Sequence, residues 1–542
     1  MVLRRREFLR TAAGLAGLGW VSRYSSPLFA QKVEARIEVL LDEPLGTISP
    51  NIYGHFIENL SGVIYDGVWV GRDSKVLNIN GVRKELIDEM HKIRPGIVRF
   101  PGGCFADSYN WRDGIGPPEN RPRRTNFCHG GERPEAPNAH RYDPNQFGTN
   151  EFVQFCRAVG AEPYLAANLR SLPAEAFYRW VEYCNSPTGS TTLADERAAA
   201  GFKDPFNVRY WGVGNESWGC GGMMRPEEYA GKYRQFVTQF PNYKEPFLIA
   251  TGPRGHSADG DIGWTSGFFE GMRGFEPPQG FSIHFYTDLR PTPLKAADFN
   301  QPEWYEVLRR GVRIDKVIES HWQEMGKFDS KRRTKLVVDE WGVWYKPGEE
   351  LAPAYILSQP ITLRDAVHTG LTFDIFNRHA DKIVMANVAQ TVNCIHSLFL
   401  ARGSQFVRTP VYYVFEMYRP HMGARQVPVA NPVAELNVPV LAGQARLPGL
   451  SASASIRDRT LAVTLTNPST ESPLKTRIRL AGGARAKEAR GAVIAHEDMK
   501  AMNTFADPEK VRPAPLAVNV SGDALELTLP KQAVAMVQCD LS

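Results

Sequence analysis

The chain has 542 residues, of which 43% are apolar and 23% are charged, as in a globular protein with ample material for two or three domains. Its formal net charge is +5, but five arginines and one glutamate among residues 1–30 contribute +4 of this. A chain that starts near Gln31 therefore carries about +1. A net charge this small gives no reason to expect nucleic acid or an anionic membrane as a partner.

The first thirty residues predict an export signal. Arg5 and Arg6, followed by Phe8, have the spacing of a twin-arginine motif, and residues 11–21 are mostly Ala, Gly and Leu. This apolar run is too short to span a bilayer. We therefore expect residues 1–30 to be a twin-arginine signal peptide and the protein to be periplasmic or secreted.

Short apolar runs alternate with helical patterns from residue 46 to about residue 400, which predicts an α/β fold. Eight strands separated by helices are typical of a closed parallel (β/α)8 TIM barrel. The strands are expected at residues 52–57, 96–100, 163–168, 210–214, 247–251, 281–285, 336–339 and 383–387. The helices are expected at residues 82–93, 151–159, 174–183, 226–240, 304–325 and 353–379.

The tail has a different composition, which predicts a second domain. All eleven Trp lie at or before Trp344, and Phe505 is the only aromatic residue after Met422. Period-two alternation with intervening turn signals predicts an all-β sandwich. Residues 33–41 alternate too and could join it. The expected organisation is a signal at 1–30, a sandwich strand within 31–45, a catalytic barrel at 46–400 and the sandwich domain at 401–542.

Two strand-end glutamates carry the predicted chemistry. Glu216 follows the strand at 210–214, and Glu340 follows the strand at 336–339. Barrel enzymes keep their active sites at the carboxyl ends of the strands, and two carboxylates across one bond are how glycosides are cleaved. Other strand ends also carry polar groups, which predicts a lined pocket; these are His55, Glu58, Arg99, Asn168, Asn215, His284, Tyr286, Asn387 and Gln390.

The cysteines and the other motifs tested do not point to a different chemistry. Seven scattered cysteines without a C-x-x-C pair do not indicate a disulfide framework, although a bridge formed after export stays open. Thiol chemistry is conceivable for Cys104 or Cys220, but burial as small apolar side chains is the simpler interpretation for most of the seven. The signatures of zinc peptidases, P-loop proteins and serine hydrolases are absent. No cofactor and no metal are expected, since two carboxylates suffice.

From about Val33 to its end, the chain resembles the α-L-arabinofuranosidases of glycoside hydrolase family 51. The resemblance implies a barrel fused to a carboxyl-terminal jelly-roll sandwich, and release of terminal arabinofuranose from arabinan, arabinoxylan or derived oligosaccharides with retention of configuration. Members of the family commonly form trimers or hexamers. The motifs that carry it are Ile52–Glu58, Val98–Asp107, Trp111–Pro117, Trp180–Asn185, Gly212–Glu216 and Asp339–Trp341.

The resemblance also implies roles for individual residues. Glu216 matches the general acid/base and Glu340 the nucleophile, so Glu216 is expected to be protonated and Glu340 ionised in the free enzyme. Asn215 matches the residue that binds the sugar 2-hydroxyl, and Tyr286 would orient Glu340. The other sugar hydroxyls would be bound by Glu58, Arg99, Asn168 and Gln390, an apolar wall would come from Trp341 and Trp344, and His284 would hydrogen-bond a carboxylate or simply pack.

Two positions depart from the commonest pattern of that family. Cys104 stands where part of the family has an asparagine that contacts the sugar, so we treat it as a substrate-site position. Gly342 replaces an asparagine and predicts a more flexible loop. Two other functions are compatible with the sequence: a barrel glycosidase of the same clan with another specificity, such as an endoglucanase or β-xylosidase, and a non-catalytic carbohydrate-binding protein.

Overall fold

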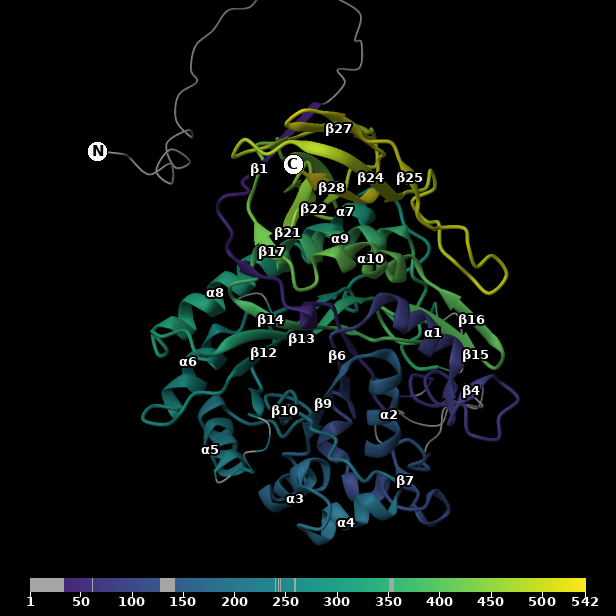
Figure 1. Ribbon diagram of the computed structural model, residues 1–542, viewed down its shortest axis with the longest axis vertical. Helices are drawn as coiled ribbons and strands as arrows, with labels where there is room; N and C mark the ends of the chain where they lie inside the picture. The colour runs from purple at the N-terminus through teal and green to yellow at the C-terminus, as the bar shows by residue number, and fades with distance from the viewer. Residues whose placement is uncertain are drawn as a thin grey trace, which may run out of the picture. The chain divides into compact units, whose positions relative to one another are not determined.

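The computed structural model describes residues 34–542 except 61, 127–141, 239, 242, 244, 258–259 and 350–354. The predicted signal at residues 1–30 lies outside the described residues. The described chain contains a closed β-barrel surrounded by helices. A five-stranded and a seven-stranded β-sheet are formed mostly by its carboxyl-terminal part (Figure 1). Among the described helices, none is long and apolar enough to cross a membrane.

The barrel has eight parallel strands, so the predicted (β/α)8 architecture is confirmed. Each strand falls on one of the eight apolar runs, and β14 closes the ring by pairing with β3. In order around the barrel the strands are β3 (Gly54–Phe56), β6 (Ile97–Phe100), β9 (Glu162–Ala167), β10 (Tyr210–Val213), β11 (Phe247–Ala250), β12 (Gly280–Asp288), β13 (Lys335–Trp344) and β14 (Ile383–Ala389).

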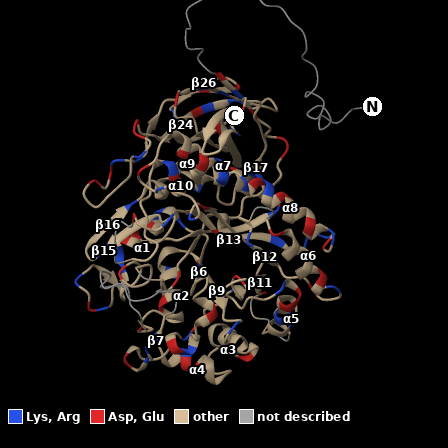
Figure 2. Ribbon diagram, turned by 180° about the vertical axis from the view of Figure 1, so that it is seen from behind, with Lys and Arg blue, Asp and Glu red and all other residues tan. Residues whose placement is uncertain are grey.

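Burial on both faces explains why the barrel strands are apolar nearly throughout. Eight of the nine residues of β12 are buried, because side chains point alternately into the barrel and toward the surrounding helices. Most of these helices bury one stripe, and acidic and basic residues are interspersed along outer helices such as α5 and α8 (Figure 2). In α9, by contrast, every residue except Arg378 is buried. The helices in this part of the chain are α1 (Lys84–Ile93), α2 (Thr149–Val159), α3 (Ala174–Asn185), α4 (Thr192–Ala199), α5 (Pro226–Val237), α6 (Ile262–Gly271), α7 (Gln301–Gly311), α8 (Ile314–Gly326) and α9 (Leu363–Arg378).

Two predicted helices differ from the structure. The helix expected at 304–325 is two helices, since α7 ends at Gly311, where an added Cβ would lie 2.5 Å from the His368 ring of α9. The helix expected at 353–379 begins only at Leu363, and residues 353–354 lie outside the described residues. Thr362 is the N-cap residue of α9. Its backbone N–H donates a hydrogen bond of 2.7 Å to the carboxylate of Asp365 in the first turn, which fixes the start of the helix.

The carboxyl-terminal part is rich in β-structure, as predicted. One sheet has the order β18-β1-β23-β27-β26 and the other β2-β17-β21-β22-β28-β24-β25. The amino-terminal strand β1 (Glu34–Val39) pairs in parallel with β23. The predicted domain boundaries near residues 45 and 400 stay predictions. The strands are β2 (Gly46–Thr47), β17 (Arg425–Val427), β18 (Val429–Ala430), β21 (Ser451–Arg457), β22 (Thr460–Asn467), β23 (Leu474–Leu480), β24 (Ala486–Ile494), β25 (Ala514–Leu516), β26 (Asn519–Ser521), β27 (Ala524–Leu529) and β28 (Ala533–Leu541).

Helix α9 joins the barrel to the seven-stranded sheet. An added Cβ at Gly370 of this helix would lie 2.7 Å from the Thr466 hydroxyl and 2.9 Å from the Val534 side chain, so only glycine allows this close approach. Helix α10 (Pro410–Tyr418) packs beside α9. The main apolar core is continuous from the barrel through these helices to Val534 and Met536 of β28. The barrel is therefore supported from the side by the sandwich.

Candidate active site

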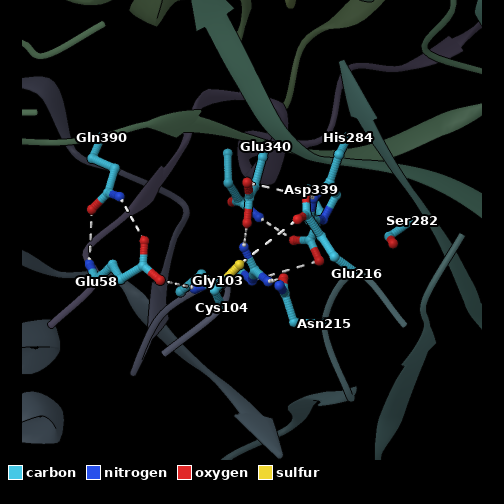
Figure 3. A network of polar contacts seen from close by, with 12 residues as sticks. Glu58, Gly103, Cys104, Asn215, Glu216, Ser282, His284, Asp339, Glu340 and Gln390 are labelled. Carbon is cyan, nitrogen blue, oxygen red and sulfur yellow. Dashed lines mark hydrogen bonds and ion pairs between the residues drawn. The ribbon is translucent and has the colours of Figure 1, made fainter. Parts of the chain in front are cut away.

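Glu216 and Glu340 lie together at the carboxyl ends of the barrel strands (Figure 3). Glu340 is within β13, paired in register with His284 of β12, and Glu216 lies three residues beyond the end of β10. A carboxylate oxygen of each glutamate and a ring nitrogen of His284 lie within 4.8 Å of one another. Glu216 has a φ of 38°, a left-handed backbone conformation that is uncommon outside glycine and recurs at functional sites.

Glu340 is buried and bound on both oxygens. The Arg99 guanidinium donates to its Oε1 at 2.7 Å, and the Tyr286 hydroxyl donates to its Oε2 at 2.7 Å, as the predicted orienting role of Tyr286 requires. Burial by itself raises the pKa of Glu340, but the charges of His284 and Arg99 and these two hydrogen bonds outweigh it and hold the pKa below its usual range. The environment therefore favours an ionised Glu340.

Glu216 is more open and has different neighbours. Its side chain is 17% exposed, and its Oε1 lies 2.9 Å from Nδ1 of His284. The same ring nitrogen lies 3.4 Å from Oε2 of Glu340. Burial lowers the pKa of His284, but the negative charges of Glu340 and Glu216 outweigh that effect and raise it. His284 is thus placed between the two carboxylates rather than packed away, which answers the question left open by the sequence.

A disulfide between Cys104 and Cys220 lies against Glu216. The two sulfurs are 3.8 Å and 3.6 Å from Oε2 of Glu216. This pairing corrects the expectation of unpaired thiols and removes thiol chemistry at either residue. The sequence could not reveal it, because 116 residues separate the pair and the loops after β6 and β10 meet only when the barrel closes. The other described cysteines, Cys156, Cys184, Cys394 and Cys539, are free and buried.

Arg99 contacts protein groups instead of an open pocket. Besides Glu340, its guanidinium donates to the Asn215 side-chain oxygen at 2.6 Å and lies 3.6 Å from the Asp339 carboxylate. The residue is fully buried. Its predicted role in binding a sugar hydroxyl is therefore corrected: Arg99 orients Glu340 and Asn215.

Glu58 and Gln390 form a second pair on the same face, to one side of the glutamates (Figure 3). Gln390 donates to Oε2 of Glu58 at 3.0 Å and accepts a hydrogen bond from the Glu58 backbone N–H at 2.9 Å. The backbone N–H groups of Gly103 and Phe105 donate to Oε1. Burial and the negative charge of Glu340 raise the pKa of Glu58 to about 7. An added Cβ at Gly103 would lie 2.7 Å from Oε1 of Glu340, so this position needs glycine.

Asn168 and Trp341 do not fit their expected roles. Asn168 donates to the Tyr109 carbonyl and the Ser171 hydroxyl, so it fixes the loop after β9. Trp341 is 1% exposed and packs on Phe373, Phe376, His396 and Phe415, because alternation along β13 points it away from Glu340.

Trp344 is half-buried and contacts Tyr286 and Arg290, with the Arg290 guanidinium 3.7 Å from its ring centre. Gly342 lies inside β13, where an added Cβ would be 2.6 Å from Cβ of His396, and not in a flexible loop. Among the other strand-end residues, His55 is buried against Phe415, outside the glutamate cluster.

Sequence reasoning missed two buried carboxylates that hold the site together. Asp107 accepts hydrogen bonds from the backbone N–H groups of Leu169, Arg170 and Asn215, which ties the loops after β9 and β10 to each other. Asp339 accepts hydrogen bonds from Tyr164 and Asn387, both at 2.8 Å. Asp107 and Asp339 stood within the quoted motifs, but only the closed barrel reveals their partners.

The cluster of Glu216, His284 and Glu340 is also the one in the described chain whose spacing could hold a metal ion without disturbing the disulfide. Arg99 and Tyr286 already bind both oxygens of Glu340, and a guanidinium beside the carboxylate is a poor neighbour for a cation. The arrangement is suited to acid, base and nucleophilic chemistry by the side chains themselves.

Two models of known protein families and several known proteins match this chain. Residues 89–288 match the α-L-arabinofuranosidase 1 domain, and residues 339–532 match the α-L-arabinofuranosidase C-terminal domain. An intracellular exo-α-L-arabinofuranosidase of Bacteroides ovatus is 35% identical over 95% of this chain and 97% of its own length. An intracellular exo-α-(1->5)-L-arabinofuranosidase 1 of Bacillus subtilis is 28% identical, over 87% of this chain and 92% of its own.

The comparisons also correct one prediction and identify the family. Both relatives are named intracellular, which contradicts the predicted export to the periplasm or beyond. A short arginine motif before an apolar run also fits a chance basic start. The crystal structure of the GH51 arabinofuranosidase from Xanthomonas axonopodis pv. citri has a TM-score of 0.87 and 33% identity, covering 94% of this chain and all of that one. The chain therefore belongs to the α-L-arabinofuranosidases of glycoside hydrolase family 51.

Proposed function

We propose that this protein is an exo-acting α-L-arabinofuranosidase that removes terminal arabinofuranose from arabinose-containing polysaccharides and oligosaccharides, with retention of anomeric configuration. The single observation that carries the mechanism is the approach of Glu216 and Glu340 oxygens to within 4.8 Å. Retaining glycosidases hold their two carboxyl groups about 5 Å apart, whereas inverting ones leave room for a water molecule between them. The names of the relatives support the sugar specificity.

In the first step Glu340 acts as the nucleophile. Its Oε1 or Oε2 attacks the anomeric carbon, the glycosidic bond breaks, and Glu216 donates its proton to the departing oxygen. The product is a covalent glycosyl-enzyme ester on Glu340. The lowered pKa of Glu340 supports this role, because only the ionised carboxylate can attack.

In the second step Glu216 acts as the base. It takes a proton from a water molecule, the water oxygen attacks the anomeric carbon, and the bond to Glu340 breaks to return both carboxyl groups to their starting states. His284 lies against both carboxyl groups, so its positive charge would stabilise whichever glutamate is ionised: Glu340 before the first step and Glu216 in the glycosyl-enzyme intermediate.

The sugar ring would be held by the polar groups around this pair. Asn215, oriented by Arg99, would bind the 2-hydroxyl, and Glu58 with Gln390 would bind hydroxyls on the opposite side. Cys104, within the disulfide, would form the wall beside Glu216. Such a site discriminates between sugars, because an analogue that lacks a hydroxyl leaves a buried polar group unpaired.

The test compares initial hydrolysis rates on aryl α-L-arabinofuranoside, β-D-xylopyranoside and β-D-glucopyranoside. We expect rapid turnover of the arabinofuranoside alone and a loss of at least about 10⁴-fold in kcat for Glu340→Ala. Proton NMR of the first product in water would show the α anomer before mutarotation. The β anomer would contradict retention, and turnover of a different sugar would move the specificity to another barrel glycosidase.

The quaternary state is part of the same proposal. The family resemblance implies trimers or hexamers. Size-exclusion chromatography with light scattering would give a mass of three or six times 60.6 kDa for the full chain if that is correct.

A further inference from the structure

The disulfide contacts the oxygen of Glu216 that His284 does not contact. The sulfurs of Cys104 and Cys220 lie 3.8 Å and 3.6 Å from Oε2 of Glu216 (Figure 3). Nδ1 of His284 lies 2.9 Å from the other oxygen, Oε1. Within the described residues, no N–H or O–H group of the protein contacts Oε2. The two oxygens of this carboxyl group therefore have different neighbours, a disulfide and an imidazole ring.

This difference indicates which oxygen of Glu216 carries the proton that is transferred. Burial lowers the pKa of His284, but the negative charges of Glu340 and Glu216 outweigh burial and raise it, which favours a protonated ring. A protonated ring donates through Nδ1 to Oε1, so the proton of the neutral Glu216 acid lies on Oε2. Sulfur is a weak acceptor and a disulfide has no proton to donate, so the disulfide does not compete for that proton. Its contacts at van der Waals distance still limit where Oε2 can move.

The turn after β10 brings Cys220 back over the acid/base. Glu216 has a φ of 38°, and its carbonyl oxygen accepts hydrogen bonds from the backbone N–H groups of Gly219 and Gly221, at 2.7 Å and 3.1 Å. An added Cβ at Gly221 would lie 1.8 Å from the carbonyl oxygen of Asn215, so the turn needs glycine directly after Cys220. The sulfur of Cys220 also lies 3.8 Å from Nδ2 of Asn215. One sulfur thus contacts the acid/base and the residue that precedes it.

The other half of the bond belongs to a segment that is fixed on the opposite side of the site. Cys104 stands between Gly103 and Phe105, whose backbone N–H groups both donate to Oε1 of Glu58 at 3.0 Å. Glu58 is in turn held by Gln390. The bond between Cys104 and Cys220 therefore joins the turn that carries Glu216 to a segment anchored on a different barrel strand.

We propose that Cys104 and Cys220 are a positioning pair for the acid/base: their bond holds Oε2 of Glu216 where it donates to the departing oxygen, and reduction of the bond weakens acid catalysis. This inference rests on the proposed function and adds a dependence on redox state to it. General acid catalysis depends on placement, because a displacement of about 1 Å can cost about 100-fold in rate.

The bond is within reach of a thiol reductant. Both of its cysteines are half-buried, and Cys220 lines a cleft of about 680 Å³, whereas the other described cysteines are free and buried. A thiolate of a dithiol attacks the sulfur of Cys220, the S–S bond breaks, and the sulfur of Cys104 leaves and takes up a proton. The second thiol of the reagent then releases Cys220 as a thiol, so two electrons reduce the protein and the reagent becomes a disulfide.

Reduction changes the surroundings of Oε2. Sulfurs that are no longer bonded repel each other at bonding distance, so at least one of them moves relative to Glu216. The turn after β10 also loses its covalent link to the segment of Cys104. Disulfides persist in oxidising compartments and are opened by the thiol pool of reducing ones, so the rate of hydrolysis would follow the redox state of the surroundings.

The test separates acid catalysis from the rest of the reaction by the choice of leaving group. The value kcat/KM is measured on phenyl and on dinitrophenyl α-L-arabinofuranoside, before and after treatment with dithiothreitol. Dinitrophenolate is a weak base that leaves without a proton, whereas phenolate needs the proton of Glu216. We expect reduction to lower kcat/KM about tenfold on the phenyl substrate and less than about twofold on the dinitrophenyl substrate. Reoxidation should restore both values.

Cysteine variants repeat the test without a reductant. Cys220→Ala should show the same split between the two substrates and no response to dithiothreitol. The matched control is Cys539→Ala, which removes a buried free cysteine of the sandwich strand β28. It should keep both values and respond to the reductant as the unmodified enzyme does. Thiol titration follows the opening of the bond, which releases two thiols per chain. If the bond resists the reagent, Cys220→Ala carries the test; if that variant does not fold, the reduced enzyme carries it.

Three results would count against these assignments. Unchanged kcat/KM on both substrates after the bond is opened overturns the positioning role. An equal fall on both substrates also overturns it, because a general loosening of the site does not discriminate between leaving groups. Absence of any turnover of the dinitrophenyl substrate by the unmodified enzyme overturns the proposed function, and this inference with it.

Discussion

Two buried carboxylates, Glu340 in the barrel mouth and Asp374 on α9 facing the sandwich, have opposite electrostatic environments. Asp374 is fully buried and accepts hydrogen bonds from four hydroxyl groups, those of Tyr418, Ser453, Thr464 and Thr466. Burial raises its pKa in spite of these bonds. The pKa of Glu340 is lowered because its neighbours include the charged groups of Arg99 and His284.

The difference shows that buried carboxylates have two separate roles in this molecule. Neutral hydroxyl donors satisfy a carboxylate without fixing its charge, so Asp374 serves to join α9 to β21 and β22. Charged donors keep a buried carboxylate ionised and therefore reactive, at the cost of desolvating the whole cluster. The same side-chain chemistry thus gives a structural joint in one place and a nucleophile in the other.

The largest effect expected from this comparison is on stability. Asp374→Ala leaves four buried hydroxyl groups without their shared acceptor, so we expect a loss of about 2 to 3 kcal/mol in the free energy of unfolding. The value kcat/KM should stay within about twofold of the unmodified enzyme. Denaturant unfolding and aryl arabinofuranoside kinetics measure the two quantities. A large fall in kcat with unchanged stability would contradict the structural role of Asp374.

A smaller effect is expected when one donor to Glu340 is removed. Tyr286→Phe loses the 2.7 Å hydrogen bond that stabilises the ionised form, so kcat/KM should fall about tenfold and its acid limb should move to higher pH. The matched control is Tyr418→Phe, which removes a donor to Asp374. It should lower stability and leave the pH profile in place. A shifted acid limb in the control would argue against the electrostatic explanation.

The smallest effect is the pH dependence of stability, which should have opposite signs at the two carboxylates. The pKa of Asp374 is raised on folding, so its ionisation costs stability as pH rises above the ordinary value near about 4. The pKa of Glu340 is lowered on folding, so its contribution is present above the ordinary value and is lost as pH falls through the folded one.

This sign difference is measured by thermal unfolding between about pH 3 and pH 6.5. The Tm advantage of the unmodified enzyme over Asp374→Ala should shrink as pH rises, and its advantage over Glu340→Ala should shrink as pH falls. Expressed as the free energy of unfolding, the contribution of each carboxylate changes by at most about 1.4 kcal/mol per pH unit. Parallel slopes for the two variants would show that their environments do not differ in the stated way.

Several features of the site could be read from the sequence because they are local. An apolar run that ends on an acid predicts both the strand and the position of the acid, as at Glu216 and Glu340, and all eight barrel strands fall on the predicted apolar runs. Parallel strands in one barrel bring their carboxyl ends to one face, so Glu216 and Glu340 could be placed together although they are 124 positions apart in the sequence. Tyr286 and Gln390 lie near carboxylates of that face for the same reason.

Other features could not be read in this way, because they depend on which side of a strand or loop a residue occupies. Trp341 follows Glu340 directly, and strand alternation alone turns it into the core. The sequence predicted that Arg99 binds a sugar hydroxyl, but in the folded chain its guanidinium contacts Glu340, Asn215 and Asp339.

By itself the sequence determined the class of fold, the pair of catalytic candidates and the family, since these depend on periodicity and on motifs within a few residues. Only the tertiary structure decided the disulfide between Cys104 and Cys220, the bridging position of His284 and the shared acceptor Asp107. These features join loops that are far apart in sequence, and closing the barrel is the physical event that brings the loops within hydrogen-bonding distance.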